Sequence, residues 1–417
     1  AYVGTKRAEP SISELRSYLG EKLPEYMMPS VFVFMESLPL TTNGKIDRAA
    51  LPMPEQVQDG SKKSFVAPRT NTEHALKKIF EKCLNRSSIG ITDDFFELGG
   101  NSVQAAIAFS HIRKALGKSL PLSLLILAPT IEKLAAYIDG KTEKKTFSSL
   151  VPIQPNGHKQ PLFCIHGGLG NVLFYRHLSN HLGTDQPVYG LQAKGLTEAD
   201  EPSASIEEMA AAYINEIRSV QPQGPYYLTG YCFGAIVAFE IAQQLVRAGE
   251  KIAFLGSLNG IGPVRQRSAK SSSLFRMYPT GSIKQIAMYP ILMSKFLLRR
   301  YSLLAYYAIV LRARAVAYNF YQKKGRAMPD SLRRQYVVDA IDKALKKYEP
   351  EVYPGQLIIF RSPRIFKNPH LRWKKLVAGE IKTHDMPGKY KNRRFIMYEP
   401  YVGSLAEELK KYLGQPE

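Results

Sequence analysis

The sequence predicts a multidomain chain that joins a small α+β segment, a four-helix bundle and an α/β domain. Strands and helices alternate from about residue 161 to residue 417, which is typical of a mostly parallel sheet with helices on both faces. Residues 69–139 read instead as amphipathic helices, which suits a small bundle. Two polar stretches rich in Gly, Ser, Lys or Pro, 53–68 and 139–160, are expected to be linkers.

Short apolar runs such as Leu162–Ile165 suit strands that are buried on both faces of a sheet. The expected strands of the α/β domain are Leu162–His166, Val188–Leu191, Tyr226–Thr229, Ile252–Leu258, Gln356–Phe360 and Glu380–His384. Helices are expected at Ile206–Val220 and Phe233–Ala248. Residues 264–348 interrupt the alternation, and we expect them to form a helical lid over the top edge of the sheet. The bundle helices are expected at Thr72–Leu84, Val103–Leu116 and Pro129–Ile138.

The chain has a net charge of +21, and most of it lies in the lid segment. Residues 264–350 hold 18 Lys and Arg against 4 acidic residues. A basic patch can bind nucleic acid, but no recognition motif accompanies this one, so we expect a surface for an acidic domain or a phosphate-bearing arm. The longest apolar run, Tyr301–Leu311, is shorter than the roughly 20 residues that span a membrane.

Three cysteines without paired spacing argue against a disulfide framework and for a reducing compartment, so a cytoplasmic protein is expected. No metal site is expected. The N-terminus shows no signal peptide and begins as if within a strand, which predicts a fragment of a longer protein.

The segment Gly230-Tyr231-Cys232-Phe233-Gly234 lies between a predicted strand and a predicted helix. It has the pattern of a nucleophile elbow, G-x-S-x-G, with a thiol in place of the hydroxyl. A helix N-terminus favours the thiolate, so the pattern predicts acyl transfer through sulfur. Alone, the five residues fit a buried structural cysteine equally well.

A glycine-rich loop, His166-Gly167-Gly168-Leu169-Gly170, follows the first predicted strand. Such a loop can direct backbone N–H groups at an oxyanion, and we expect Gly167 and Phe233 to supply the two donors. We interpret His166 as a residue that shapes the loop rather than as a base.

Two further positions have both a plain and a functional interpretation. Ser102 begins a predicted helix, where a serine often serves only as an N-cap. Lys45 follows the strong turn signal Asn43-Gly44, and it is either an exposed hairpin lysine or a point charge for a neighbouring active site.

Longer motifs resemble parts of nonribosomal peptide synthetases. Met28-Pro29-Ser30 with LPLTTNGKIDRAAL (38–51) resembles the C-terminal subdomain of an adenylation domain, which implies that residues 1–52 are an adenylation tail and that Lys45 helps to form an aminoacyl adenylate. FFELGGNS (95–102) resembles the attachment motif of a peptidyl carrier protein. That resemblance implies that Ser102, within a carrier domain at 69–139, bears covalent 4′-phosphopantetheine.

The remaining residues, 161–417, resemble releasing thioesterase domains of the α/β-hydrolase fold. The segments that carry this resemblance are LFCIHGGLGNVLFYRHLSNHL, DQPVYGLQAKGL, YYLTGYCFGAIVAFEIAQQL and EPYVGSLAEEL. It implies that Cys232 is the nucleophile and that Asn259 stands at the acidic triad position. The position of the family's histidine falls on Arg393, which cannot act as a base because its pKa stays above about 12. His384 is the remaining candidate base.

We therefore expect a termination module that carries an aminoacyl or peptidyl thioester at Ser102 and transfers it to Cys232. Release would follow by hydrolysis, aminolysis or cyclisation. The expected partners are upstream adenylation and condensation domains and a phosphopantetheinyl transferase. The alternative is a carrier fused to a catalytically impaired thioesterase-like scaffold that only docks the carrier, which Arg393 and Asn259 favour.

Overall fold

The computed structural model places the α/β unit and the helical unit in detail and the N-terminal segment in part. It describes residues 65–141, 148–196, 201–260, 314–321, 328–362, 370–387 and 401–414, and shorter stretches that include 1–5, 32–41 and 44–48. Within these ranges, every helix is too short or too polar to span a lipid bilayer.

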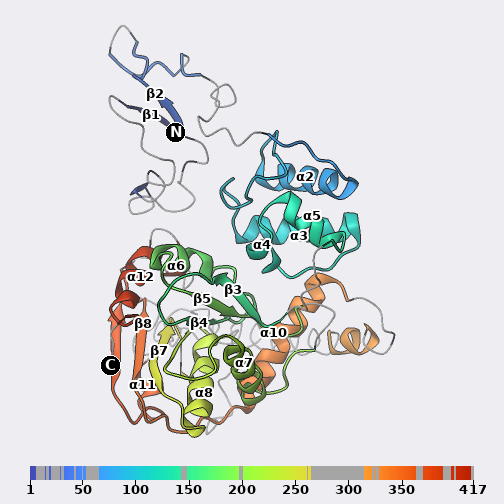
Figure 1. Cartoon of the computed structure of the whole chain (residues 1–417). Coiled ribbons are helices and arrows are strands. Elements are labelled where there is room, and N and C mark those ends of the chain that lie inside the picture. Colours follow the sequence, from blue (N-terminus) through green and yellow to red (C-terminus); the bar gives the residue numbers. More distant parts are fainter. Residues whose placement is uncertain are drawn as a thin grey trace, which may run out of the picture.

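A seven-stranded sheet forms the centre of the α/β unit (Figure 1). Its strands are β3 (Leu150–Gln154), β4 (Leu162–Ile165), β5 (Val188–Leu191), β6 (Tyr226–Tyr231), β7 (Ile252–Leu258), β8 (Leu357–Arg361) and β9 (Ile381–Asp385). They lie in the order β3-β5-β4-β6-β7-β8-β9. β3 runs antiparallel to β5, and the other neighbouring pairs are parallel. The carboxyl ends of β4, β6 and β7 therefore meet at one edge of the sheet.

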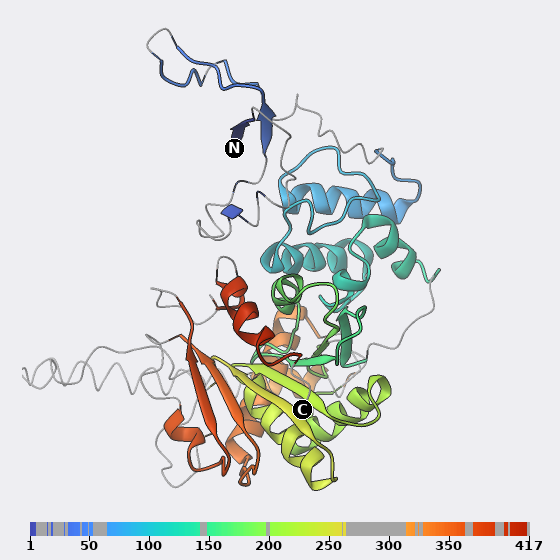
Figure 2. The same cartoon turned by 60° about the vertical axis from the view of Figure 1, so that its left-hand side comes forward.

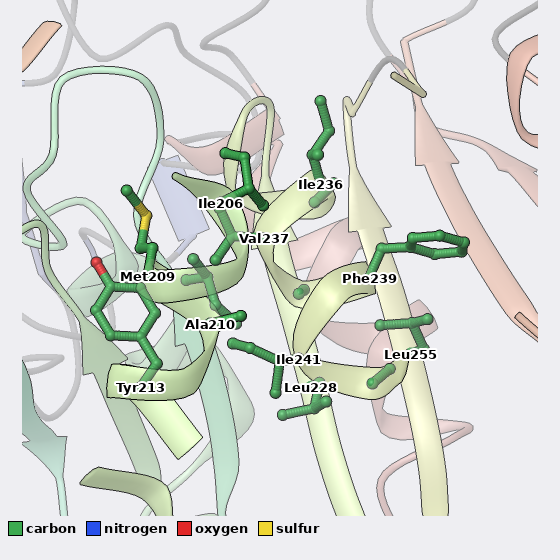
Figure 3. Packing of buried hydrophobic residues seen from close by; sticks show 14 of the residues in the cluster. Ile206, Met209, Ala210, Tyr213, Leu228, Ile236, Val237, Phe239, Ile241 and Leu255 are labelled. Atoms are coloured by element: carbon green, nitrogen blue, oxygen red, sulfur yellow. The ribbon is translucent and has the colours of Figure 1, made fainter. Parts of the chain in front are cut away.

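Helices cover both faces of this sheet and bury two separate apolar clusters. One cluster holds side chains of α7 (Ile206–Val220), α8 (Gly234–Arg247) and α10 (Asp330–Lys347), and Figure 3 shows part of it. The other holds side chains of α6 (Tyr175–Leu182) and α12 (Val402–Lys410). Burial at about 25 cal/mol per Å² of apolar surface makes these two clusters the main source of stability for the layered arrangement.

The six expected strands are confirmed, and their ends differ from the expected ones by no more than two residues. The prediction of a linker over 139–160 was wrong in part, because β3 lies within it and joins the sheet through β5. Helices α6 and α12 were not predicted from the sequence. Of the expected lid, residues 264–313 lie outside the described residues, whereas α10 packs into the core through Val337 and Ile341.

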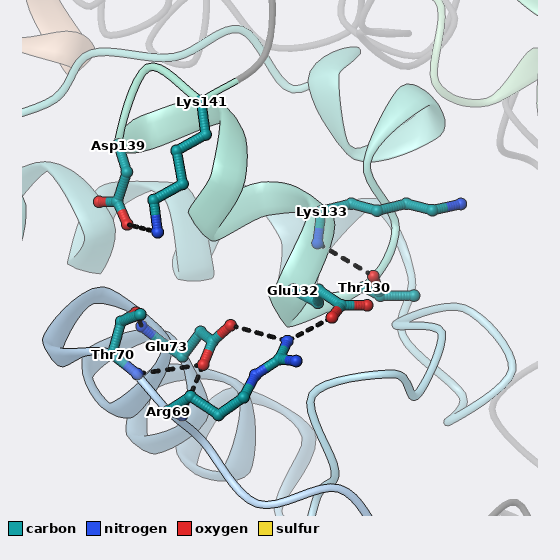
Figure 4. Close-up of polar contacts among 8 residues, drawn as sticks. All are labelled: Arg69, Thr70, Glu73, Thr130, Glu132, Lys133, Asp139 and Lys141. Atoms are coloured by element: carbon teal, nitrogen blue, oxygen red, sulfur yellow. Dashed lines mark hydrogen bonds and ion pairs between the residues drawn. The ribbon is translucent and has the colours of Figure 1, made fainter.

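Residues 71–138 form a helical unit with its own apolar core. Its helices are α2 (Asn71–Leu84), α3 (Ser102–Leu116), the short α4 (Leu124–Leu127) and α5 (Ile131–Ile138). A polar network joins the starts of α2 and α5, because Arg69 pairs with both Glu73 and Glu132 (Figure 4). Thr70 caps α2 and completes a capping box with Glu73. The three expected helices are confirmed, and α4 was missed.

The N-terminal segment contributes two short parallel strands, β1 (Tyr2–Gly4) and β2 (Val33–Met35). A tight hairpin follows, closed by an antiparallel bridge between Leu40 and Ile46. Figure 2 shows this segment beyond the helical unit. The helical part of the expected α+β segment falls mostly outside the described residues.

A close backbone contact joins β4 to the start of α8. A Cβ on Gly234 would lie 2.4 Å from the carbonyl oxygen of His166 and 2.5 Å from that of Ile165. A Cβ on Gly230 would lie 2.1 Å from the backbone of Gly234. Only glycine therefore lets the helix begin this close to the central strands.

We predict that Gly234→Ala destabilises the α/β unit by about 1–3 kcal/mol, because its new methyl group would meet fixed backbone atoms. The chain has one tryptophan, Trp373, which is fully buried in the cluster under α8, so its fluorescence during urea unfolding reports on this unit. Gly168→Ala is the matched control, since a Cβ there meets nothing within 4 Å. Equal unfolding midpoints for the two variants would contradict the close-contact argument.

Candidate functional site

Cys232 occupies a strained turn at the carboxyl end of the central strand β6. Its φ is +55°, a left-handed conformation that residues other than glycine rarely adopt. The turn is fixed by a 2.9 Å hydrogen bond from the Cys232 N–H to the carbonyl of Leu258 on β7. The residue is partly exposed, and helix α8 begins two positions later. A strained, partly exposed thiol at a helix N-terminus is well placed to react as a thiolate.

The loop after β4 lies directly against this turn. The Cβ position of Gly167 is 3.2 Å from the ring of Tyr231, the neighbour of Cys232. The N–H of His166 continues the sheet by bonding to Leu191, whereas the N–H groups of Gly167 and Phe233 donate to no residue that the structure describes. The structure thus brings together Cys232 and both expected oxyanion donors.

His166 is a structural residue beneath the site, as its sequence position indicated. Its side chain is completely buried, and its Nδ1 lies 2.7 Å from the carbonyl oxygen of Gly167. Its ring packs against Phe233 at 5.7 Å and against Tyr213 at 6.0 Å. Burial lowers the pKa of His166 to about 4, and the bond to Gly167 offsets only part of that effect. The ring is therefore neutral near pH 7.

Asn259 ends β7 at the same edge of the sheet and is also buried, with a φ of +48°. Its N–H bonds to the carbonyl of Phe360 at 2.8 Å. Its side-chain Oδ1 accepts the N–H of Ser362, also at 2.8 Å. A backbone N–H can only donate, so this bond shows which end of the amide is the oxygen. Oδ1 has a second lone pair that can accept another N–H, and Nδ2 can only donate.

This orientation matters for any imidazole that approaches Asn259. Through Oδ1, an asparagine can accept the N–H of an imidazole and orient it, but it lacks the charge with which a carboxylate stabilises an imidazolium. In serine proteases, Asp→Asn at the equivalent position lowers the rate by about 10⁴. Asn259 is therefore a weaker partner for a catalytic histidine than a carboxylate.

His384 faces a different part of the molecule, and its expected role as base is not supported. Its Nε2 lies 2.7 Å from the hydroxyl of Tyr412, and its Nδ1 lies 3.2 Å from Glu408. Its ring stacks on Phe360 at 5.1 Å. Both nitrogens are thus engaged with the α12 side of the sheet. Arg393 lies outside the described residues.

Ser102 is the first residue of α3, but it is not the cap of that helix. Asn101 is the N-cap, and its side chain accepts the N–H groups of Val103 and Gln104, while Gln104 closes the capping box. The Ser102 hydroxyl takes no part in this cap and is partly exposed. The plain interpretation of Ser102 as an N-cap is therefore wrong. A free hydroxyl at a helix start suits the attachment of a phosphate-linked group.

The packing and backbone conformation of the helical unit itself require the two glycines before Ser102. A Cβ on Gly100 would lie 2.3 Å from the ring of Phe95, which is fully buried in the helical core, and Gly99 has a φ of +93°.

Lys45 is exposed at the hairpin tip of the N-terminal segment. Thr41 closes the hairpin by accepting from and donating to the backbone of Lys45. This contact holds the backbone of Lys45 and leaves its ammonium group at the surface.

Comparison with known proteins identifies the two larger units. The family profile described as the thioesterase domain matches residues 160–390, more than half of the chain. The chain belongs to the thioesterase domain family. The sheet order and the elbow after the central strand are those of its α/β-hydrolase fold. The profile of the phosphopantetheine attachment site matches residues 74–138, so the helical unit carries 4′-phosphopantetheine covalently.

The curated relatives are much longer proteins. A dimodular nonribosomal peptide synthase of Bacillus subtilis is 33% identical over 408 residues, which cover 94% of this chain and 16% of that protein. Malpinin synthetase of Mortierella alpina is 43% identical over 247 residues, covering 59% of this chain and 3% of the relative. This chain thus spans only a small part of these relatives.

One solved structure resembles the whole chain. It is the holo form of a four-domain nonribosomal peptide synthetase bound to AMP and glycine. The TM-score is 0.51 at 29% identity, covering 100% of this chain and 31% of that one.

The buried His166 predicts an acid-sensitive thioesterase unit. Its pKa is about 4 when folded and about 6.5 when unfolded, so between these pH values only the unfolded state takes up the proton. Stability is complete above pH 6.5 and falls by up to about 3 kcal/mol as pH drops to 4. Trp373 fluorescence in urea at pH 7 and pH 4.5 should show a smaller loss for His166→Gln than for the wild type. Equal losses would rule out this source of acid sensitivity.

The cap of α3 predicts opposite outcomes for two adjacent residues. Asn101→Ala should destabilise the phosphopantetheine unit by about 0.5–2 kcal/mol, because two N–H groups lose their acceptor. Ser102→Ala should change its stability by less than about 0.5 kcal/mol. Amide hydrogen exchange of α3 in the whole chain measures both values. A larger loss of stability for Ser102→Ala than for Asn101→Ala would show that Ser102 caps α3 after all.

Proposed function

We propose that the chain is the termination module of a nonribosomal peptide synthetase, and that Ser102 is the attachment residue. Ser102 is supported by its free hydroxyl, since Asn101 supplies the helix cap. When attached, 4′-phosphopantetheine supplies a long flexible arm whose terminal thiol holds an aminoacyl or peptidyl group as a thioester.

In the proposed transfer, the Cys232 thiolate attacks the carbonyl carbon of that thioester. The new bond forms between the carbonyl carbon and the Cys232 sulfur, and the former carbon–sulfur bond breaks. The N–H groups of Gly167 and Phe233 stabilise the negative charge that develops on the carbonyl oxygen. A proton lost from the Cys232 thiol balances the thiolate released. The observation that carries this proposal is the strained backbone of Cys232 at the end of β6.

Sulfur reduces the need for a base in the first step. A thiolate exchanges with a thioester without a net proton transfer, whereas a serine hydroxyl must lose its proton during attack. Release by water does need a general base, and the loss of one costs a factor on the order of 10²–10⁴. We therefore propose that an amine or an internal nucleophile of the acyl chain releases the product faster than water does.

The second candidate function is a docking scaffold that binds the phosphopantetheine unit without chemistry. The specific observations in its favour are the uncharged amide of Asn259 in place of a carboxylate and the engagement of both nitrogens of His384. Both weaken a conventional triad, but neither affects the placement of Cys232.

The wider partners follow from the relatives and are also proposals. Upstream adenylation and condensation domains would supply the acyl chain, and a phosphopantetheinyl transferase would modify Ser102. Lys45 would serve an adenylation core that is not part of this sequence, in a reducing, cytoplasmic compartment.

The test loads the whole chain with an acyl pantetheine thioester and follows its mass by peptide mapping. Ser102→Ala should not be loaded. Cys232→Ala should keep the acyl group on the peptide that contains Ser102, because the acceptor sulfur is gone. The wild type should show the same mass increase on the peptide that contains Cys232.

Cys83→Ala is the matched thiol control, and His384→Ala tests the remaining histidine. Both should acylate Cys232 at the wild-type rate. If the wild type never carries an acyl group on Cys232 and releases product no faster than Cys232→Ala, the scaffold function holds instead.

A further inference from the structure

The phosphopantetheine unit contacts the thioesterase through the segment that leads into α6. Leu173 belongs to the thioesterase, yet it is only 2% exposed and packs in the same cluster as the core of the helical unit. Ile126 on α4 packs against this cluster and also against the α6 and α12 cluster of the thioesterase. The two apolar cores are therefore continuous at this point.

A cation–π contact lies beside Leu173. The Arg176 guanidinium on α6 lies 4.1 Å from the ring centre of Phe96, which lies three residues before Gly99 in the segment that leads to Ser102. Asp94 holds the Phe96 loop by accepting the N–H groups of Phe96 and Glu97. Burial lowers the pKa of Arg176, whereas the charges of Asp94 and Glu97 act to raise it. Arg176 is thus partly desolvated, and it faces the acidic residues Asp94 and Glu97 of the helical unit.

A second contact ties the other end of α3 to the thioesterase. The Arg113 guanidinium donates to the carbonyl oxygen of Met328 at 2.8 Å, and Met328 is buried just before α10. The helical unit therefore contacts the thioesterase both at α6 and near α10. Figures 1 and 2 show the helical unit next to this part of the thioesterase.

The α6 contact lies next to the proposed nucleophile. Phe174, between Leu173 and α6, has its ring 5.3 Å from that of Tyr231, the neighbour of Cys232. A unit resting on α6 is therefore held near the edge of the sheet where Cys232 lies.

We propose that α6 is the docking helix for the phosphopantetheine unit and that Arg176 is the positioning residue that selects it. Arg176 stacks on Phe96 and faces the acidic loop 94–97, while Leu173 fills the apolar part of the interface. The occupant is this chain's own helical unit, or one with the same aromatic and acidic loop. The consequence for acyl transfer rests on the function proposed above, whereas the docking itself does not.

The experiment uses the whole chain with Arg176→Glu, Glu97→Arg and the double variant. Lys374→Glu is the matched control, because Lys374 is exposed beside α11 (His370–Trp373), on the side of the sheet away from the helical unit. Amide hydrogen exchange reports docking directly. Exchange in residues 94–98 should rise for both single variants, fall back in the double variant and stay unchanged in the control.

Transfer to Cys232 is the second measurement. Arg176→Glu should slow transfer from Ser102 roughly 2- to 30-fold, the range that loss of a cation–π contact spans. Acylation of Cys232 by a small diffusible thioester should keep the wild-type rate, because it does not require docking. The double variant should recover part of the lost rate.

Unchanged exchange in residues 94–98 of Arg176→Glu would overturn the docking proposal. If exchange responds as expected but no variant ever acylates Cys232, docking on α6 stands and the proposed transfer fails. The two proposals are therefore tested separately.

Discussion

The close backbone contact between β4 and the β6–α8 turn is the constraint on which the rest of the site depends. Gly234 lies against the carbonyl groups of Ile165 and His166, so the helix begins almost in contact with the neighbouring strand. The same turn holds Cys232 in a left-handed conformation, and the residue is partly exposed. The same contact brings the loop of Gly167 beside the turn. One steric requirement thus places the proposed nucleophile and both proposed oxyanion donors.

Burial explains why His166, at the start of the loop beside this turn, is unsuited to act as a base. His166 has no exposed surface, and protonation would place a charge among Phe233 and Tyr213. Removing a charge from water costs several kcal/mol, so the ring stays neutral and holds the loop through Gly167. A base must exchange protons with solvent or substrate, and a fully enclosed ring cannot do so.

The sequence predicted the sheet and the elbow well because both depend on local patterns. Short apolar runs and a G-x-C-x-G turn need no knowledge of distant residues. β3 was missed because Leu150–Gln154 is flanked by polar residues and gains its apolar partners only by pairing with β5. The direction of His384 could not be predicted either, since its partners follow it in the chain: Glu408 lies on α12 and Tyr412 in the turn after that helix.

The same limit applies to Ser102 and Asn259, where the decisive atoms are those of neighbours. Asn101 takes the capping role that a serine pattern suggests, and this leaves the Ser102 hydroxyl free. Ser362 shows which end of the Asn259 amide is the oxygen, because its N–H donates to Oδ1. An amide in place of a carboxylate carries no charge to stabilise an imidazolium, and a hydroxyl nucleophile needs that stabilisation more than a thiol does. A thiol ionises several pKa units more readily than a hydroxyl, so the same exchange leaves its attack possible and affects mainly the release step.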